Sequence, residues 1–213
     1  MRQKRAARTW RTLVDAAAEV FDRDGYEGTS LTRIAQAADT SLGALTFHFD
    51  SKEHLARTVG EEGCAATRSA LAEIPARQDS PVEWLVSFTL ALTGLLDRDP
   101  AVRAAARLTR ELLWTPPNWY STWQPTLRAR LAESHPSQLP PSADPATLTA
   151  LTSHLVAGSE SCARHRTYHP EAAAQDCSAS TSSSSSDDVS RILRLVLDTT
   201  PSTQTSHPTG LHP

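Results

Sequence analysis

Apolar residues recur three or four positions apart along most of the chain, which is the spacing of one face of an α-helix. The first such stripe covers residues 10–21. It is stopped by the segment 24–28, where Gly25 can take the left-handed conformation that ends helices. Shorter stripes follow over 31–38 and 42–49. The N-terminal part is therefore predicted to consist of three helices separated by short turns.

The rest of the chain begins its helices in a repeated way. Ser80, Asp99 and Asp144 each precede a proline, and a capping side chain followed by proline is a favoured helix start. The apolar stripes expected to form the remaining helices lie at 55–59, 85–96, 102–113, 148–156 and 189–197. No stretch of useful length alternates apolar and polar residues. We therefore predict an all-α fold.

Two short helices joined by a tight turn satisfy the requirement of a helix-turn-helix, whose second helix enters the major groove of DNA. Ala35 is small where the two helices would cross, Asp39 tolerates the turn, and Gly43 keeps the start of the second helix free of bulk. Helix pairs of this kind also occur in proteins that do not bind DNA. The pattern alone leaves both interpretations open.

The residues around this helix pair resemble a known family. The segments 29–35, 38–49 and 51–55 are similar to the DNA-binding domain of the TetR family, and most of all to the γ-butyrolactone autoregulator receptors and their pseudo-receptor relatives in actinomycetes. The residues shared at the family's spacing are Ile34, Ala35, Gly43, Leu45, His48, Phe49, Lys52 and Leu55. The likeness is close over about residues 9–60. It implies a first domain that binds DNA and C-terminal helices that bind a small molecule and form a dimer.

The resemblance also implies a set of DNA-binding residues. The positions that usually contact phosphates are Ser30, Thr46, His48 and Lys52, those that face bases are Ser41, Leu42, Ala44 and Phe47, and Arg33 and Gly43 complete the predicted site. The chain departs from the family's pattern at three positions. Asp39 replaces the usual turn glycine, Leu42 stands at an often basic position, and Thr46 replaces a phosphate-contacting tyrosine. We therefore expect modest operator affinity or an unusual operator, with Leu42 able to contact a thymine methyl group.

The net charge of the chain does not indicate DNA binding, but the distribution of charge along the chain agrees with a DNA-binding N-terminal part. The net charge is −3, but residues 1–58 carry nine Lys and Arg against eight Asp and Glu, and the remainder carries twelve against sixteen. Five basic residues precede the first acidic one, namely Arg2, Lys4, Arg5, Arg8 and Arg11. A basic leader on an acidic protein suggests one face that meets phosphates, although short basic starts are also common on proteins without such a partner.

Aromatic residues single out a candidate ligand site in the C-terminal part. Three of the five tryptophans lie within residues 114–123, in a chain that is only 6% aromatic. Such a block can pack the entrance of a helix or line an apolar pocket. The receptors that this chain resembles carry a tryptophan at the position of Trp123 in their butyrolactone pocket, which favours the pocket. The predicted ligand-binding residues are Trp84, Phe88, Leu92, Trp119 and Trp123.

Other chemistry has weaker support. Cys162, His165 and His169 lie close together, but they lack a second cluster, and Arg164 and Arg166 would repel a cation. The chain has no Gly-x-Ser-x-Gly, phosphate-binding glycine loop or His-Glu-x-x-His motif. We therefore expect that the protein is not an enzyme, that it has no catalytic residues, and that it binds no metal or cofactor. No signal peptide or membrane span is expected, and three widely spaced cysteines do not suggest disulfides. We therefore expect a cytoplasmic protein with no membrane partner.

The predicted organisation has three parts. Residues 1–55 form the helix-turn-helix domain, 56–198 form the helical ligand-binding and dimerisation domain with a serine-rich insertion over about 163–186, and 199–213 form a disordered tail. The function expected is that of a repressor that binds a palindromic operator as a homodimer and is released by a small apolar effector, such as a γ-butyrolactone-type signal. Two alternatives stay open. One is a TetR-like antagonist or partner-binding module that binds DNA weakly, and the other is a Cys/His metal or redox sensor.

Overall fold

The structure is a computed structural model that describes residues 2–75, 80–112, 117–140, 143–171 and 184–197. Within these ranges the chain is helical and contains no strand, which confirms the predicted all-α fold. The helices are α1 (Arg2–Asp24), α2 (Leu31–Ala37), α3 (Leu42–His48), α4 (Lys52–Ala72), α5 (Pro81–Arg98), α6 (Pro100–Glu111), α7 (Gln124–Ala132), α8 (Pro145–Tyr168) and α10 (Ser185–Leu197), with short 3₁₀ helices η1 (Tyr120–Thr122) and η2 (Pro136–Gln138).

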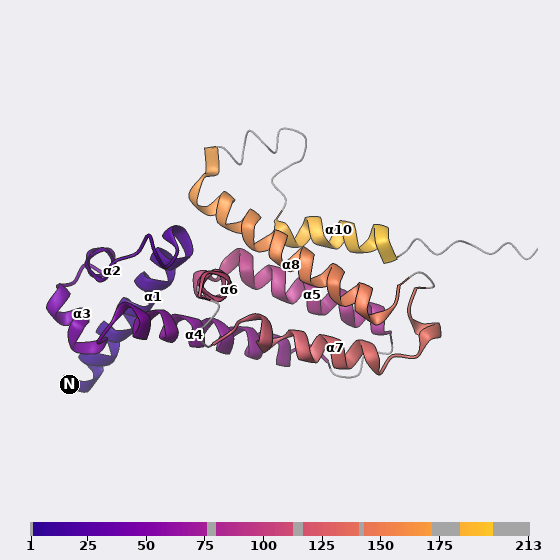
Figure 1. The fold of residues 1–213 in the computed structure, drawn as a ribbon, viewed down its shortest axis with the longest axis horizontal. Helices are drawn as coiled ribbons and strands as arrows, with labels where there is room; N and C mark the ends of the chain where they lie inside the picture. Colours follow the sequence, from indigo (N-terminus) through magenta and orange to yellow (C-terminus); the bar gives the residue numbers. More distant parts are fainter. Residues whose placement is uncertain (1, 76–79, 113–116, 141–142, 172–183, 198–213) are drawn as a thin grey trace, which may run out of the picture.

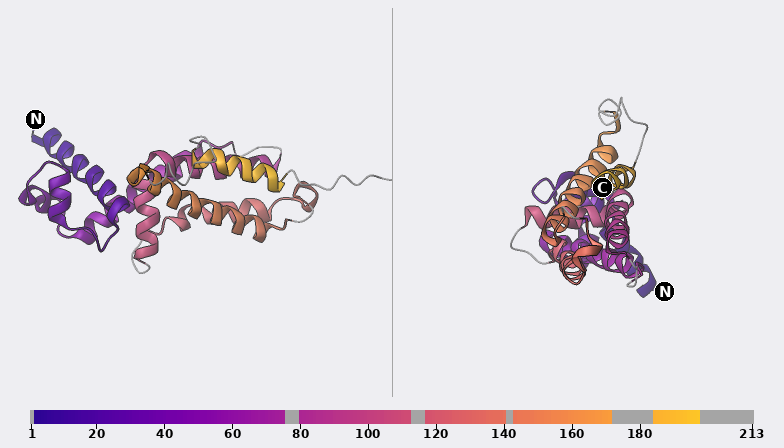
Figure 2. Two further views of the ribbon diagram at one scale, coloured as in Figure 1. Left: turned by 90° about the horizontal axis from the view of Figure 1, so that it is seen from above. Right: turned by 90° about the vertical axis from the view of Figure 1, so that its right-hand side faces the viewer.

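The helices form an elongated molecule with two ends of different character. Helices α1, α2 and α3 lie at one end, and α5, α7, α8 and α10 lie side by side at the other (Figures 1 and 2). Helix α4 runs from the first group into the second, and α6 crosses between them, packed against both α1 and α4. The long helices of the body therefore hold the short helices α2 and α3 away from the bulk of the protein.

Serine side chains begin the short N-terminal helices. The Ser30 hydroxyl accepts a hydrogen bond from the Arg33 N–H at the start of α2, and the Ser41 hydroxyl accepts one from the Ala44 N–H at the start of α3. Ser51 caps α4 in the same way. Each cap satisfies a backbone donor that the helix leaves without a partner. The predicted caps of the later helices, by Ser80, Asp99 and Asp144, are confirmed.

The turn between α2 and α3 requires a left-handed residue. Asp39 has φ 48°, and its N–H donates to the Gln36 carbonyl while the Thr40 N–H donates to the Ala35 carbonyl. This pair of bonds is the Schellman motif, which ends a helix with one residue at positive φ, usually glycine. Asp39 therefore stands where a glycine would fit without steric cost, as its place in the family's pattern suggests.

Two hydrophobic cores fill the two ends. The first combines α1, α2, α3 and the start of α4 with Ala104 and Leu108 of α6 and with Leu112, which follows α6. The second lies among the helices of the body and contains the buried rings of Trp84, Phe88, Trp119 and Trp123. Because α6 contributes to both cores, it joins the two ends rigidly.

Three helix boundaries differ from those expected from sequence. Helix α1 begins at Arg2, eight positions before the first residue of its apolar stripe, so the basic leader is helical. Helix α8 continues to Tyr168, beyond the predicted start of the insertion, because Ala163 is buried and the Tyr168 hydroxyl donates to Asp22. Helix α10 begins at Ser185. In each case the extension carries residues that the apolar stripe alone did not include.

The serine-rich composition of residues 178–186 predicts that this tract buries nothing, and the prediction is wrong at the C-terminal end of the tract. Ser185 is 4% exposed, and its hydroxyl lies 2.6 Å from Nη2 of Arg166, which donates to it. Ser186 donates to the Asp97 carboxylate from both its N–H and its hydroxyl. Serine can be buried where its hydroxyl finds such partners. Other sequence expectations, for Trp114, residues 172–183 and the tail 199–213, lie outside the described residues.

Candidate nucleic-acid interface and ligand pocket

Helix α3 presents apolar side chains to solvent at the end of the molecule. Phe47 is 81% exposed and Leu42 is 44% exposed, while Leu45 and the neighbouring Phe49 are buried in the first core. Apolar side chains that gather on one exposed face are a feature of surfaces that bind another molecule. The structure thus separates the predicted base-facing residues, which point outward, from the residues that anchor the helix.

Gly43 is not required by the fold. A Cβ atom built at Gly43 would meet only the Ser41 hydroxyl, at 4.0 Å. Other glycines differ: a Cβ at Gly63 would lie 2.5 Å from the Ala101 carbonyl oxygen, because α4 and α6 cross there. Since no other described residue comes within 4 Å of this Cβ position, the space above Gly43 is open to the close approach of another molecule.

The predicted phosphate-contacting residues fall into two groups. Ser30 and Thr46 are exposed, and the Thr46 hydroxyl donates to the Gly43 carbonyl at 3.2 Å. The Ser30 hydroxyl accepts as a cap, which leaves its own hydrogen able to donate to a phosphate. His48 and Lys52 are half-buried, and the His48 ring packs edge-on against Phe47, with centroids 5.2 Å apart.

Two of the predicted basic residues are already engaged within the protein. Lys52 Nζ donates to the Tyr26 carbonyl at 2.9 Å and to the Thr29 carbonyl at 3.1 Å, and it lies 4.1 Å from the centroid of the Tyr26 ring. Arg33 pairs with Asp24 at 3.3 Å. Because an ammonium group has three donors, Lys52 keeps one for another partner. The charge that α2 and α4 offer to DNA is smaller than the residue types alone suggest.

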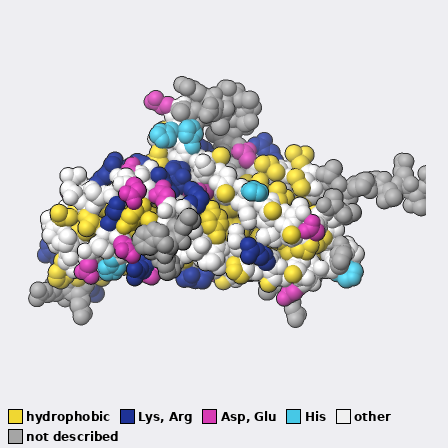
Figure 3. Space-filling model, in the orientation of Figure 1, with side chains coloured by type: hydrophobic (Ala, Val, Ile, Leu, Met, Phe, Trp, Pro, Cys, Tyr) yellow, Lys and Arg dark blue, Asp and Glu magenta, His cyan; other side chains and the backbone are white. Residues whose placement is uncertain are grey.

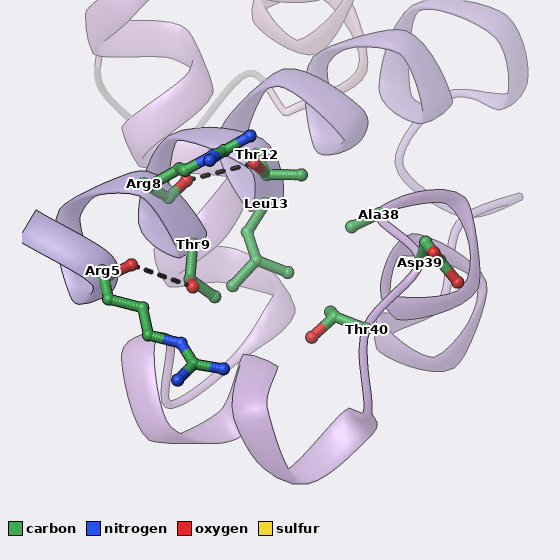
Figure 4. Close-up of a pocket in the computed structure, with 8 residues that line it drawn as sticks. All are labelled: Arg5, Arg8, Thr9, Thr12, Leu13, Ala38, Asp39 and Thr40. Atoms are coloured by element: carbon green, nitrogen blue, oxygen red, sulfur yellow. Dashed lines mark hydrogen bonds between the residues drawn. The ribbon is translucent and has the colours of Figure 1, made fainter.

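A groove of about 310 Å³ lies between the N-terminal half of α1 and the turn that precedes α3. Figure 4 shows the Arg5 guanidinium and the Thr40 hydroxyl directed into this groove from opposite walls. Arg5 and Arg8 are exposed, whereas Arg11 is held by Asp15 and Glu62 at 3.0 and 2.8 Å. Sequence reasoning identified the basic leader but could not separate Arg11 from the two arginines that line the groove.

A larger pocket, of about 560 Å³, opens in the body between α4, α5 and α7. Trp84 and Phe88 form an aromatic wall, with ring centroids 4.7 Å apart. The remaining lining residues are Leu71, Ala72, Ile74, Thr126, Ala129, Arg130 and Glu133. The wall is therefore apolar at the rings, and the guanidinium of Arg130 lies 5.9 Å from the Trp84 ring. A pocket of this size and lining suits a small, mostly apolar molecule with a polar end.

The structure divides the predicted ligand-binding residues. Trp84 and Phe88 line the pocket, whereas Leu92, Trp119 and Trp123 are fully buried in the core behind it. The Trp119 indole N–H donates to Thr67 at 2.8 Å. The Trp123 ring lies 6.4 Å from that of Phe88, and its indole N–H has no hydrogen-bond partner among the described residues. A buried donor of this kind is rare in native proteins. The Trp123 ring is the neighbour of Phe88, which lines the pocket.

Helix α10 exposes apolar side chains beside its packed face. Val189, Leu193 and Leu197 pack into the second core, while Leu195 is 75% exposed and Val196 is 46% exposed. Hydrophobic side chains are visible over this part of the surface (Figure 3). An exposed apolar face on a helix at the edge of a body is typical of a surface that packs against another helix.

The cluster around Cys162 does not gather ligands for a metal. The His165 and His169 rings lie 5.6 Å apart, but Arg166 in the same turn of α8 is directed to Asp97, at 2.6 Å. Among the described residues no three His, Cys, Asp or Glu side chains are close enough to share an ion. Across all the residues that the structure describes, no helix combines the length and the apolar character that crossing a membrane requires.

Comparisons with known proteins agree with this geometry. Residues 13–59, which contain α2, α3 and most of α1, match the family described as bacterial regulatory proteins, tetR family. The A-factor receptor protein of Streptomyces griseus is 36% identical over 110 residues, which cover 52% of this chain and 38% of that protein. The match thus spans well under half the length of that relative.

Solved structures extend the similarity over the body. A gamma-butyrolactone receptor described as ArpA-like has a TM-score of 0.68 and 25% identity, covering 91% of this chain and 87% of that one. The TetR-family protein CprB from Streptomyces coelicolor, solved in complex with its operator sequence, has a TM-score of 0.60 and 31% identity, covering 71% of this chain and 76% of that one.

An exposed helix-turn-helix joined to a helical body with a pocket is the architecture of one-component transcriptional regulators, in which one chain carries both parts. The chain belongs to the TetR family of bacterial regulatory proteins, and it is related to the A-factor and γ-butyrolactone receptors. The relatives it matches are regulators and not enzymes.

Proposed function

We propose that the protein is a cytoplasmic transcriptional repressor that binds a palindromic operator as a homodimer and releases it when a small, mostly apolar effector binds. The observation that carries the DNA-binding part is the exposure of Phe47 and Leu42 on α3 beside the open space at Gly43. This space would admit the backbone and base edges of a major groove. The two separate hydrophobic cores support a division into a DNA-binding part, residues 1–55, and a ligand-binding and dimerisation part, residues 56–198.

In this proposal each predicted DNA-binding residue has one role. Ser41, Leu42, Ala44 and Phe47 face bases, and Ser30, Arg33, Thr46, His48 and Lys52 lie where phosphates would pass. Arg5 and Arg8 at the groove beside α1 add phosphate contacts that carry no sequence information. Because Lys52 and Arg33 are partly engaged within the protein, base contacts and the leader would supply much of the affinity.

The proposed effector site is the pocket of α4, α5 and α7. Trp84 and Phe88 would contact the apolar part of the effector, and the Trp123 indole N–H would gain an acceptor if the effector displaces Phe88 and reaches it. A γ-butyrolactone, with an alkyl tail and a polar ring, has this chemistry. Release then requires that the effector bind better to a state whose recognition helices are wrongly spaced.

The DNA-binding proposal is tested at Gly43. Replacing Gly43 with alanine should raise the free energy of unfolding by about 0.5–1 kcal/mol, because alanine favours helix and its Cβ meets no atom of the protein closely. The same Gly43→Ala change should weaken binding to an operator selected from random DNA, measured by gel shift. Ala37→Gly, at an exposed position of α2, is the reverse control for stability. Sequence-blind binding by the unaltered protein would instead support the antagonist alternative.

The effector site is tested by filling its mouth. Ala129 lines the pocket and is exposed, so Ala129→Phe should block effector entry and change the free energy of unfolding by less than about 0.5 kcal/mol. The expected result is a variant that binds operator normally and stays bound when γ-butyrolactones are added at concentrations that release the unaltered protein. Ala132→Phe, an exposed position on α7 outside the pocket, is the matched control. A normal release of the Ala129 variant would contradict the assignment.

A further inference from the structure

A fully buried carboxylate joins the DNA-binding end to the body. Asp22, near the C-terminal end of α1, is 0% exposed. One of its oxygens accepts hydrogen bonds from Arg103 Nε of α6 at 2.6 Å and from the Tyr168 hydroxyl of α8 at 2.8 Å. The other accepts from Arg164 Nε of α8 at 3.2 Å. Three donors from two helices of the body therefore bind one side chain of α1.

The charges around Asp22 continue into the body. Glu160 on α8 is 1% exposed, and its carboxylate pairs with Arg164 of the same helix and with Arg110 of α6. Burial lowers the pKa of Arg164, with further lowering by the nearby Arg107 and Arg110, although Asp22 opposes it. For Arg103, burial also works against the charge, but the Asp22 carboxylate outweighs it and the pKa is raised. Removal of Asp22 would thus leave the buried Arg103 without its carboxylate partner, while Arg164 would keep Glu160.

A second set of bonds holds the end of α1 beside this cluster. Arg107 Nη1 donates to the backbone carbonyls of Asp22 and Arg23, at 2.7 and 2.9 Å. Arg107 also pairs with Glu111, whose other oxygen accepts the Tyr26 N–H at 2.6 Å. A guanidinium at the carbonyl end of a helix is favoured by the helix dipole. In Figure 3, side chains of both charges gather where the DNA-binding end adjoins the body.

Buried ion pairs contribute little net stability, but separating the partners of one is costly, because it leaves an uncompensated charge away from water. Helix α1 shares one core with α2 and α3, so the angle of α1 to α6 and α8 is also the angle of the recognition helix to the body. A rotation of the DNA-binding end would have to break all three hydrogen bonds to Asp22 together. The joint therefore favours one orientation over its neighbours.

We infer that Asp22, Arg103 and Arg164 are positioning residues that set the distance between the two recognition helices of the proposed dimer, and so the spacing of the operator half-sites. This inference rests on the proposed function. Arg164 and Tyr168 lie on α8, which packs against α10, and α10 carries the exposed apolar side chains of the proposed dimer interface. The hydrogen bonds of Arg164 and Tyr168 to Asp22 therefore connect the helices of that interface to the DNA-binding end. None of these residues would touch DNA or effector.

The test replaces the charged cluster by apolar residues of similar size. The triple variant Asp22→Leu, Arg103→Met, Arg164→Met removes the buried carboxylate together with both guanidinium groups that pair with it, and Glu160 keeps Arg110 as its partner, so the variant should fold. Binding is measured on DNA in which two selected half-sites are separated by spacers that differ by one base pair. The unaltered protein should prefer one spacer by about ten-fold or more, and the variant should discriminate several-fold less, with unchanged affinity for a single half-site.

Two further variants keep the outcomes distinct. Tyr168→Phe removes only one of the three bonds to Asp22 and should relax the spacing preference partially, while Arg23→Gln, an exposed neighbour on α1, should not change it. A folded, dimeric triple variant that keeps the full preference would overturn the inference. If the unaltered protein binds no DNA sequence specifically, the proposed function fails first; if it binds specifically with no spacing preference, only the positioning role fails.

Discussion

At the scale of single residues, the turn before α3 shows how this chain departs from its family and still keeps the same geometry. Asp39 occupies a left-handed position that glycine normally fills, and the two hydrogen bonds of the Schellman motif are formed in spite of the side chain. Aspartate tolerates this conformation better than most residues, because its short side chain can bond locally. The substitution adds a negative charge to the turn that lines the groove opposite Arg5 and Arg8.

Two variants of Asp39 separate strain from charge. The free energy of unfolding of the Asp39→Gly variant should be about 1 kcal/mol higher than that of the Asp39→Ala variant, because only alanine keeps a Cβ at positive φ. Both remove the same negative charge from the DNA-binding end, so both should bind DNA more tightly at low salt. Urea denaturation and salt-dependent gel shifts check the two effects. Equal stability of the variants would mean that the turn does not keep its left-handed residue in solution.

At the scale of helices, the sequence predicted starts better than ends. A cap followed by proline is a local signal, and the starts at Pro81, Pro100 and Pro145 were each predicted from two adjacent residues. The end of α8 at Tyr168 and the start of α10 at Ser185 depend instead on bonds to Asp22, Asp97 and Arg166. Those partners lie far along the chain, and no local pattern specifies them.

The functional sites also divide into those that a local pattern specifies and those that depend on distant residues. The residues of α3 were predicted from a motif contained in one short segment. The pocket is lined from α4, α5 and α7, so Ile74, Arg130 and Glu133 could not be assigned before the crossing of these helices was known. The buried cluster was missed for the same reason, because Asp22 and Arg164 are 142 positions apart. A charged residue within an apolar stripe, as Arg103 is in α6, is the only signal that sequence offers for such a site.

The start of α10 provides a prediction about the serine-rich tract. Exchange of residues 178–183 for a glycine-serine sequence of equal length should leave Tm nearly unchanged, as the composition of the tract suggests. The double change Ser185→Val, Ser186→Ala should lower Tm by about 4–8 °C, because it leaves Arg166 and Asp97 with fewer buried partners. Calorimetry on the two variants decides the matter. If both melt like the unaltered protein, the bonds of Ser185 do not stabilise α10.

At the scale of the whole molecule, the exposed face of α10 determines the proposed assembly. Leu195 is 75% exposed, and a symmetric dimer through α10 would bury it twice. Leu195→Glu should therefore raise the dissociation constant of the dimer by a factor on the order of 100 or more, measured by analytical ultracentrifugation. Ala132→Glu, at an exposed position of α7, is the control. A dimer that survives the change at Leu195 must form through another surface.

The buried carboxylate at Asp22 has a consequence for how such regulators can exchange parts during evolution. A recombination event that replaced residues 1–55 with those of a relative would bring in a foreign α1, while Arg103, Arg164 and Tyr168 stayed behind. Unless the incoming helix carried an acid at the position of Asp22, the buried Arg103 would face it unpaired and Arg164 would keep only Glu160. The unit that can be inherited intact is therefore larger than the DNA-binding domain. It includes α6 and the C-terminal end of α8.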